Sequence, residues 1–113
     1  MHIRYLFPFL CAALWACTEH GEFERRLVVA DSLMTAEPDS AYRMLDAMSE
    51  EAAQMPQAQR MRHLLLRTHA QRHAGIGFTS DSISNLLVSY YNAHGTPNER
   101  MTAHYLKGFS YLE

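Results

Sequence analysis

Apolar residues recur three or four positions apart through almost the whole chain from residue 23 onward. This spacing places side chains on one face of an α-helix, and no stretch alternates with period two for long enough to predict a strand. The pattern therefore predicts an all-α chain of five helices. Its apolar stripes are Phe23, Leu27, Ala30 and Met34; Ala41, Met44, Leu45 and Met48; Ala58, Met61, Leu64, Leu65 and Thr68; Ile83, Leu86, Leu87, Tyr90, Tyr91 and His94; and Met101, Tyr105, Phe109 and Leu112.

Turn and capping residues predict where these helices begin and end. Pro38 ends the first stripe, because proline cannot continue a helix interior, and Asp39 or Ser40 is able to cap the second helix. A junction at Pro56 precedes the third helix, which runs to about Ala74 and is broken by Gly75-Ile76-Gly77. A cap within Thr79-Ser80-Asp81 begins the fourth helix, and Gly95 is its C-cap candidate. Pro97 is a helix breaker, and the fifth helix begins at about Asn98.

The boundaries and stripes recur along the chain. Asp39-Ser40 followed by Leu45 returns 42 residues later as Asp81-Ser82 followed by Leu87. Leu64 and Leu106 keep this offset, and Pro56 and Pro97 are 41 residues apart. The recurrence predicts a stacked array of helical hairpins, and the alternative is a chance coincidence in an all-helical chain.

The last helix resembles a known repeat. The segment His104-Tyr105-Leu106-Lys107-Gly108-Phe109-Ser110-Tyr111 is similar to the first helix of a tetratricopeptide repeat, whose pattern is Trp-x2-Leu-Gly-x2-Tyr. Gly108 and Tyr111 match, while His104 and Lys107 stand at the tryptophan and leucine positions. Ala41-x3-Leu45 and Ile83-x3-Leu87 loosely match the second-helix pattern Ala-x3-Phe. The resemblance implies a tetratricopeptide-like solenoid of about two and a half elongated repeats, in which the glycine lets a partner helix approach, and it carries over no catalytic residue.

The first residues look like a targeting signal. Arg4 precedes an uncharged apolar run, Tyr5 to Ala16. As a helix this run reaches about 18 Å, too short to cross a hydrocarbon core of about 30 Å, so a secretory signal is favoured over a permanent membrane span.

The end of this run resembles the lipobox of bacterial lipoproteins. In Leu14-Trp15-Ala16-Cys17 the aliphatic residue, the small residue and the cysteine match, although Trp15 is bulkier than usual. The resemblance implies lipidation of Cys17 and a stable multi-chain anchor. We expect residues 1–16 to be a signal peptide, residues 17–22 a tether and residues 23–113 the helical repeat domain. An ordinary cleaved signal, or a buried thiol at the start of a helix, is the alternative.

Composition and charge narrow the function. The 113 residues are 48% hydrophobic and 19% charged, a globular balance for one small domain. The formal charge of −2 argues against a nucleic-acid surface. Two cysteines cannot form a disulfide framework, and Cys11 would leave with the signal peptide.

Histidines on the third helix raise the question of a metal site. His63 lies there with His69 and His73, which have the i, i+4 spacing of a zinc-binding helix but lack its glutamate. No acidic residue occurs from Gln54 to Ser80, and three arginines on this helix would repel a cation. We therefore expect a solvated polar face, with no metal ligand.

Arginines and aromatic residues are the other candidates for binding. The arginines could contact anionic lipid headgroups or an acidic partner, but we favour a solubilising face that pairs with Glu50 and Glu51. We expect most of the aromatic residues to pack between helices and a fraction to line a concave peptide-binding surface. The arginines are Arg60, Arg62, Arg67 and Arg72, and the aromatic residues are Tyr90, Tyr91, Tyr105, Phe109 and Tyr111.

These features together predict a lipid-anchored protein of the cell envelope that acts as a scaffold for protein or peptide partners. It is not expected to be an enzyme or to need a cofactor, since neither a nucleophile elbow nor a phosphate loop occurs. The alternatives are the sensory N-terminal segment of a membrane-linked transcriptional regulator and a nutrient-capture lipoprotein. Because Glu113 follows an uncapped amphipathic stripe, we expect a fragment of a longer protein; the alternative is a last helix that packs elsewhere, as in a dimer.

Overall fold

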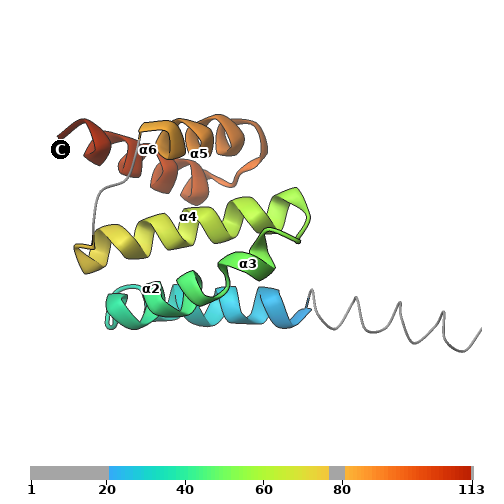
Figure 1. Cartoon of the computed structure of the whole chain (residues 1–113). Helices are drawn as coiled ribbons and strands as arrows, with labels where there is room; N and C mark the ends of the chain where they lie inside the picture. Colours follow the sequence, from blue (N-terminus) through green and yellow to red (C-terminus); the bar gives the residue numbers. More distant parts are fainter. Residues whose placement is uncertain (1–20, 77–80, 113) are drawn as a thin grey trace, which may run out of the picture.

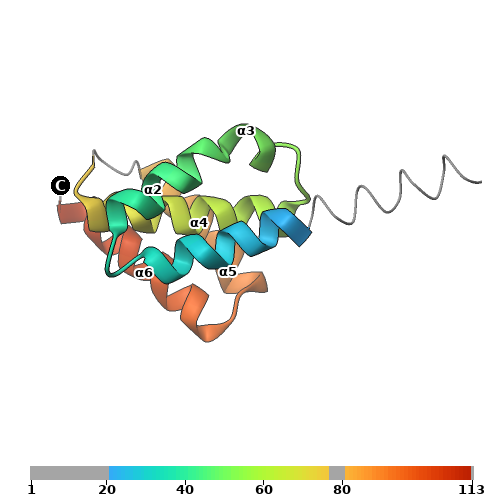
Figure 2. The same ribbon diagram turned by 90° about the horizontal axis from the view of Figure 1, so that it is seen from below.

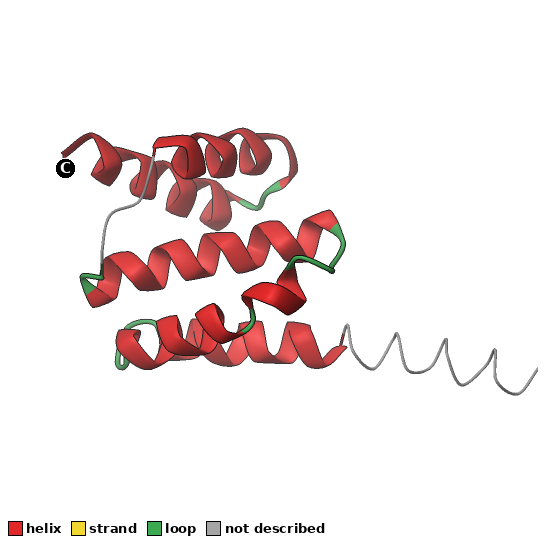
Figure 3. Ribbon diagram, in the orientation of Figure 1, coloured by secondary structure: helices red, strands yellow, loops and turns green. Residues whose placement is uncertain are grey.

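The computed structural model describes residues 21–76 and 81–112, and in this part the chain is all-helical (Figure 3). Cys17, the signal peptide and the cap within residues 79–80 lie outside it. Residues 21 and 22, expected in the tether, are already helical. The helices are residues 21–33 (called helix 21–33 below), α2 (Pro38–Ala47), α3 (Ser49–Ala52), α4 (Gln57–Ala74), α5 (Asp81–His94) and α6 (Pro97–Leu112).

The described part therefore has six helices where the sequence predicted five. The difference arises at Met48, where the backbone (φ −89°, ψ 0°) leaves the helical region and separates α2 from α3. Here the Met48 N–H donates to the carbonyl oxygen of Leu45 at 3.1 Å. This is a hydrogen bond of the 3₁₀ type, between residues three apart, and it ends the α-helical hydrogen-bond pattern.

Prolines begin helices here. Pro38 is the first residue of α2, with Glu37 as a cap that makes no side-chain bond, so the capping role predicted for Asp39 or Ser40 is wrong. Pro97 is the first residue of α6 and not a breaker before it. Both positions suit proline because the first N–H groups of a helix have no partner within it.

The start of α6 is instead fixed by a capping box between Thr96 and Glu99. The Thr96 N–H donates to Glu99 Oε1 at 2.9 Å, and the Glu99 N–H donates to Thr96 Oγ1 at 3.2 Å. This reciprocal pair satisfies two amide groups at the helix start.

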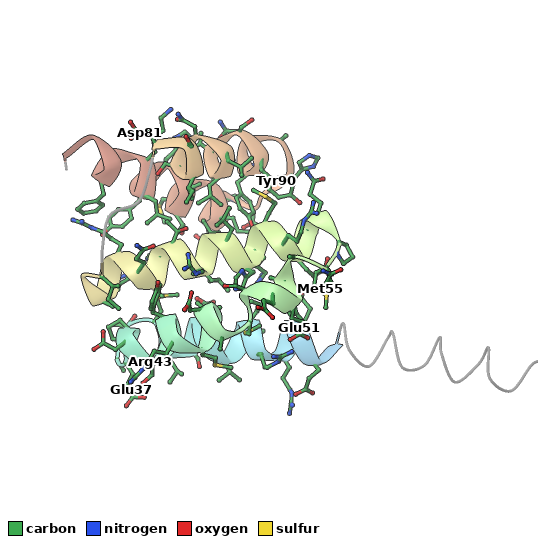
Figure 4. All side chains as sticks on the ribbon, in the orientation of Figure 1. Glu37, Arg43, Glu51, Met55, Asp81 and Tyr90 are labelled. Atoms are coloured by element: carbon green, nitrogen blue, oxygen red, sulfur yellow. The ribbon has the colours of Figure 1, made fainter. Side chains whose placement is uncertain are left out.

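α4 lies in the middle of the molecule (Figures 1 and 2), between a layer of helix 21–33 with α2 and a layer of α5 with α6. It contributes to two cores. Leu66 and Ala70 pack with the buried residues of helix 21–33 and α2, while Met61 and Leu65 pack with those of α5 and α6. Met55, before α4, belongs to the first core (Figure 4).

The predicted burial of the apolar stripes agrees best with the structure in the layer of helix 21–33 and α2. Phe23, Leu27 and Ala30 are fully buried, as predicted. On α5 the stripe is rotated: Leu86 is 51% exposed, whereas Ser84 and Val88 are buried. Because α5 packs against both α4 and α6, its buried surface is wider than the predicted stripe and lies around a different line along the helix. Ala58, predicted to be buried, is exposed at the start of α4.

Two glycines end helices in different ways. Gly75 has a φ of 67°, and the Ile76 N–H bonds to the carbonyl of Gln71 at 3.0 Å, a Schellman closure that confirms the predicted break after Ala74. Gly95 ends α5 with an ordinary φ but lies so close to Tyr91 that a Cβ would come within 2.7 Å of its Cδ1.

Candidate functional site

A pocket of about 300 Å³ lies where helix 21–33, α4 and α6 meet. Helix 21–33 contributes a single acidic residue to its wall, while α4 and α6 contribute both polar and apolar side chains. The lining residues are Asp31; Arg62, Leu65, Leu66 and His69; and Asn98, Glu99, Met101 and Thr102.

The wall holds charges of both signs. Asp31 and Glu99 are acidic, and Glu99 is held in place because it also caps α6. Arg62 supplies a guanidinium whose Nε is buried and has no hydrogen-bond partner among the described residues. A buried donor without a partner is costly, so this nitrogen is a polar group that the described fold leaves unsatisfied.

His69 connects the pocket to its rim. Its ring lies 6.2 Å from the Tyr105 ring in an edge-on arrangement, and its Nε2 is 2.9 Å from the Nε2 of His73. Burial lowers the pKa of His69, the neighbouring His73 lowers it further, and the charge of Asp31 acts in the opposite direction. His69 is therefore held toward the neutral, lone-pair-bearing form at neutral pH.

The rim continues along α6 as exposed apolar surface. Met101 is 66% exposed and Tyr105 is 46% exposed. Gly108, one turn farther along, is also exposed, and a Cβ there would have no atom within 4 Å. The role implied for this glycine, a close approach by a partner helix, is therefore not filled by any described residue. We call Met101, Tyr105 and Gly108 the α6 face.

Beyond Tyr105 the aromatic surface meets an arginine. The Tyr105 and Phe109 rings lie 4.6 Å apart, and the Arg72 guanidinium lies 3.7 Å above the Phe109 ring. This distance is well within the range of a cation–π contact. The side chain of Tyr111 lies outside the described part.

The four arginines of α4 do not form one basic face. Arg67 turns toward α2, where it bonds to Asp46 at 2.8 Å, while Arg62 and Arg72 turn toward α6. Arg60 lies in a second, shallower hollow of about 410 Å³ that Leu86 also lines.

Glu51, expected to pair with these arginines, instead accepts two bonds of 2.6 Å from Arg26 (Figure 4). The prediction that the arginines of α4 pair with Glu50 and Glu51 is therefore wrong for Glu51. The reason is that α3 turns this carboxylate toward helix 21–33.

The histidines and aromatic residues divide between core and surface. His63 is buried and does not line this pocket; its Nε2 lies 2.6 Å from the carbonyl oxygen of Leu45. Tyr91 is 3% exposed in the second core, and Tyr90 packs edge-on against it at 5.0 Å. Packing between helices thus accounts for Tyr91, whereas Tyr105 is on the surface.

The sequence did not predict the pocket residues Asp31, Leu66, Glu99 and Thr102. Asp31 lies far along the chain from Arg62 and Glu99, and no local spacing connects these positions. Among the described residues, no group of three or more His, Cys, Asp or Glu side chains is placed to hold a metal ion. Within residues 21–76 and 81–112, no helix combines the length and the apolar character that crossing a bilayer requires.

The chain was compared with protein-family models, with curated proteins and with solved structures, and no match was found in any of them.

Proposed function

We propose that this chain is a lipid-anchored envelope scaffold that binds a peptide segment of a protein partner in the pocket and along the α6 face. The observation that carries the proposal is the continuity of the two surfaces. Met101 lines the pocket and is itself 66% exposed, and His69 of the pocket contacts the exposed Tyr105.

The chemistry of this surface suits a peptide. Tyrosine and methionine are enriched where proteins bind one another, and the flexible methionine adapts to the shape of its partner. The pocket adds the side chains of Arg62 and Asp31, one of each charge. An extended peptide or an amphipathic helix could cover the α6 face and place one acidic side chain in the pocket beside Arg62.

The arrangement of the helices supports a repeat array with this surface on one side. Leu45 of α2 and Leu87 of α5, which are 42 residues apart, are both fully buried. If the helices stack as tetratricopeptide-like hairpins, helix 21–33, α4 and α6 are the first helices of successive pairs. These are the three helices that line the pocket, and solenoids bind partners on such a shared concave face.

The binding test begins with peptides selected from a displayed library against the native chain. Their affinities are then measured for the native chain and for Tyr105→Glu, Arg62→Gln and the control Leu86→Glu. We expect about a tenfold or larger loss for the first two variants, as for residues central to an interface, and no change for the control. The proposal fails if Leu86→Glu loses binding and Tyr105→Glu does not, because the second hollow would then be the binding site.

The anchor is tested separately. Labelled palmitate is expected to enter the native protein in bacterial cells and not Cys17→Ala. Labelling of both proteins, or of neither, would contradict lipidation of Cys17. This result does not depend on the peptide-binding test.

A further inference from the structure

The two imidazoles of His69 and His73 meet through their Nε2 atoms. The residues are four apart on α4, so their side chains lie on the same face of the helix. The Nε2 atoms are 2.9 Å apart, and the rings are tilted by 55° with centroids 4.5 Å apart. Without a ligand, one ring donates its N–H to the lone pair of the other.

This separation also matches a metal chelate. Two nitrogens at about 2.0–2.1 Å from a common ion and 2.9 Å from each other subtend about 90° at that ion. A right angle belongs to square-planar and octahedral coordination, whereas a tetrahedral ion needs nitrogens about 3.3 Å apart. Square-planar or tetragonal nitrogen sites favour Cu²⁺ and Ni²⁺, and Cu²⁺ binds more tightly of the two.

The sequence argued against a metal here because of the arginines of α4 and the absence of nearby acids. The tertiary structure weakens the second objection and part of the first, since Arg62 still lines the same pocket as His69. Arg67 bonds to Asp46 of α2, and Arg72 stacks on Phe109. Asp31, from helix 21–33, lines the same pocket as His69 and brings a negative charge toward the pair.

We propose that His69 and His73 chelate one Cu²⁺ ion through their Nε2 atoms, with water in the remaining positions. The ring that donates in the free pair moves its proton to Nδ1, so that both Nε2 lone pairs reach the ion. The absence of a third protein ligand in the described part leaves the site open and without the glutamate base of a zinc protease. It is a binding site and not a hydrolytic centre.

The experiment uses tag-free protein in which Cys11 and Cys17 are replaced by serine in every sample, so that thiolates do not compete for copper. Cu²⁺ is titrated at about pH 7.5, because metal binding requires deprotonated imidazole nitrogens, and binding is followed by calorimetry and electron paramagnetic resonance. The variants are His69→Ala and His73→Ala. The matched control is His104→Ala, an exposed histidine whose Nε2 lies 3.0 Å from Asn92 Oδ1.

We expect each pair variant to bind Cu²⁺ at least about tenfold more weakly than the parent, since even the loss of an outer-sphere partner costs that much. His104→Ala should bind like the parent, and the parent spectrum should be axial with nitrogen ligands. Equal affinity in His73→Ala and the parent, or an equal loss in His104→Ala, would overturn the proposal.

A second measurement guards against misfolded variants. A ligand that binds only the folded state raises its melting temperature, so Cu²⁺ should raise that of the parent and of His104→Ala but not that of His73→Ala. His73 is exposed, and its helix is held by two cores, so we expect this variant to fold. A Cu²⁺-dependent rise in His73→Ala equal to that of the parent would count against the site.

Discussion

The imidazole Nε2 of His63 lies 2.6 Å from the backbone carbonyl oxygen of Leu45, and this bond joins the middle of α4 to the last turn of α2. His63 is 5% exposed, and its ring lies 6.2 Å from that of Phe23. A carbonyl oxygen only accepts, so His63 Nε2 carries a proton, and burial favours the neutral Nε2–H form of the ring over the imidazolium.

The burial of His63 predicts a loss of stability in acid. Burial lowers the pKa of His63, and Arg67 lowers it further, while the bond to Leu45 and the charge of Asp46 act in the opposite direction. Because the unfolded chain then takes up the proton more readily than the folded chain, the free energy of unfolding falls as the pH drops below 6.5. The contribution of His63 is fully present above that value.

Urea unfolding at about pH 7.5 and about pH 5.5 measures this loss. His63→Gln keeps an N–H donor without a titrating ring, so it should lose less stability between the two pH values than the native chain. His104→Gln, on the surface of α6, should behave like the native chain. An equal acid loss in all three proteins would show that His63 is not responsible.

Gly95→Ala should destabilise the fold by about 1–3 kcal/mol, as overpacking does. A Cβ there would lie 2.7 Å from Tyr91 Cδ1 and 2.8 Å from the carbonyl oxygen of Tyr91. The second contact is with backbone and cannot be relieved by a rotamer change. Thermal and urea unfolding measure the change.

Two other glycines serve as comparisons. Gly75→Ala meets no atom but places a side chain at a φ of 67°, which costs about 1–2 kcal/mol. Gly108→Ala is in open space within α6 and should stabilise the helix by about 0.5–1 kcal/mol. If Gly95→Ala proves as harmless as Gly108→Ala, the close packing against Tyr91 is absent in solution.

Glu51→Gln should destabilise the chain by about 1 kcal/mol. The carboxylate accepts two bonds from Arg26 and ties α3 to helix 21–33. The side chains are 34% and 31% exposed, so solvent screening reduces the contribution below that of a buried pair. Glu50→Gln removes the neighbouring exposed carboxylate and should change little. Added salt should narrow the difference between the native chain and Glu51→Gln.

Tyr91→Phe should leave stability unchanged or raise it by up to about 1 kcal/mol. The Tyr91 hydroxyl is buried without a hydrogen-bond partner among the described residues, and burial raises the pKa of this phenol. Removing the oxygen therefore relieves an unmet polar group while the ring stays packed. Tyr90→Phe, on the half-buried neighbour, is the matched control. A loss above about 1 kcal/mol in Tyr91→Phe would show that the hydroxyl has a partner in solution.

Leu65→Ala and Leu66→Ala should each cost about 2–5 kcal/mol, although they alter different cores. Leu65 belongs to the core with α5 and α6, and Leu66 to the core with helix 21–33 and α2. Because α4 joins the two cores, both variants should unfold in a single transition that different probes report alike. Two separate transitions would show that the layers fold independently. Leu64→Ala, half-buried, should cost less.

Local sequence was sufficient to predict the helices of the described part apart from the separate α3. Three- and four-residue spacing marked the buried stripe from Phe23 to Met34, and Gly75 marked the end of α4, because helix periodicity and a left-handed cap depend on neighbouring residues alone. The positions of prolines were recognised but their role was reversed at Pro97, since a proline that cannot continue a helix is well suited to begin one.

Only the tertiary structure decided what those helices present to their surroundings. A single stripe on α4 could not reveal that Leu66 and His63 face one core while Leu65 faces another, because a central helix is covered on two sides. Asp31 reaches Arg62 and His69 through the packing of separate helices. The directions of Arg67 and Arg72 depend on Asp46 and Phe109, residues that no sequence spacing joins to them.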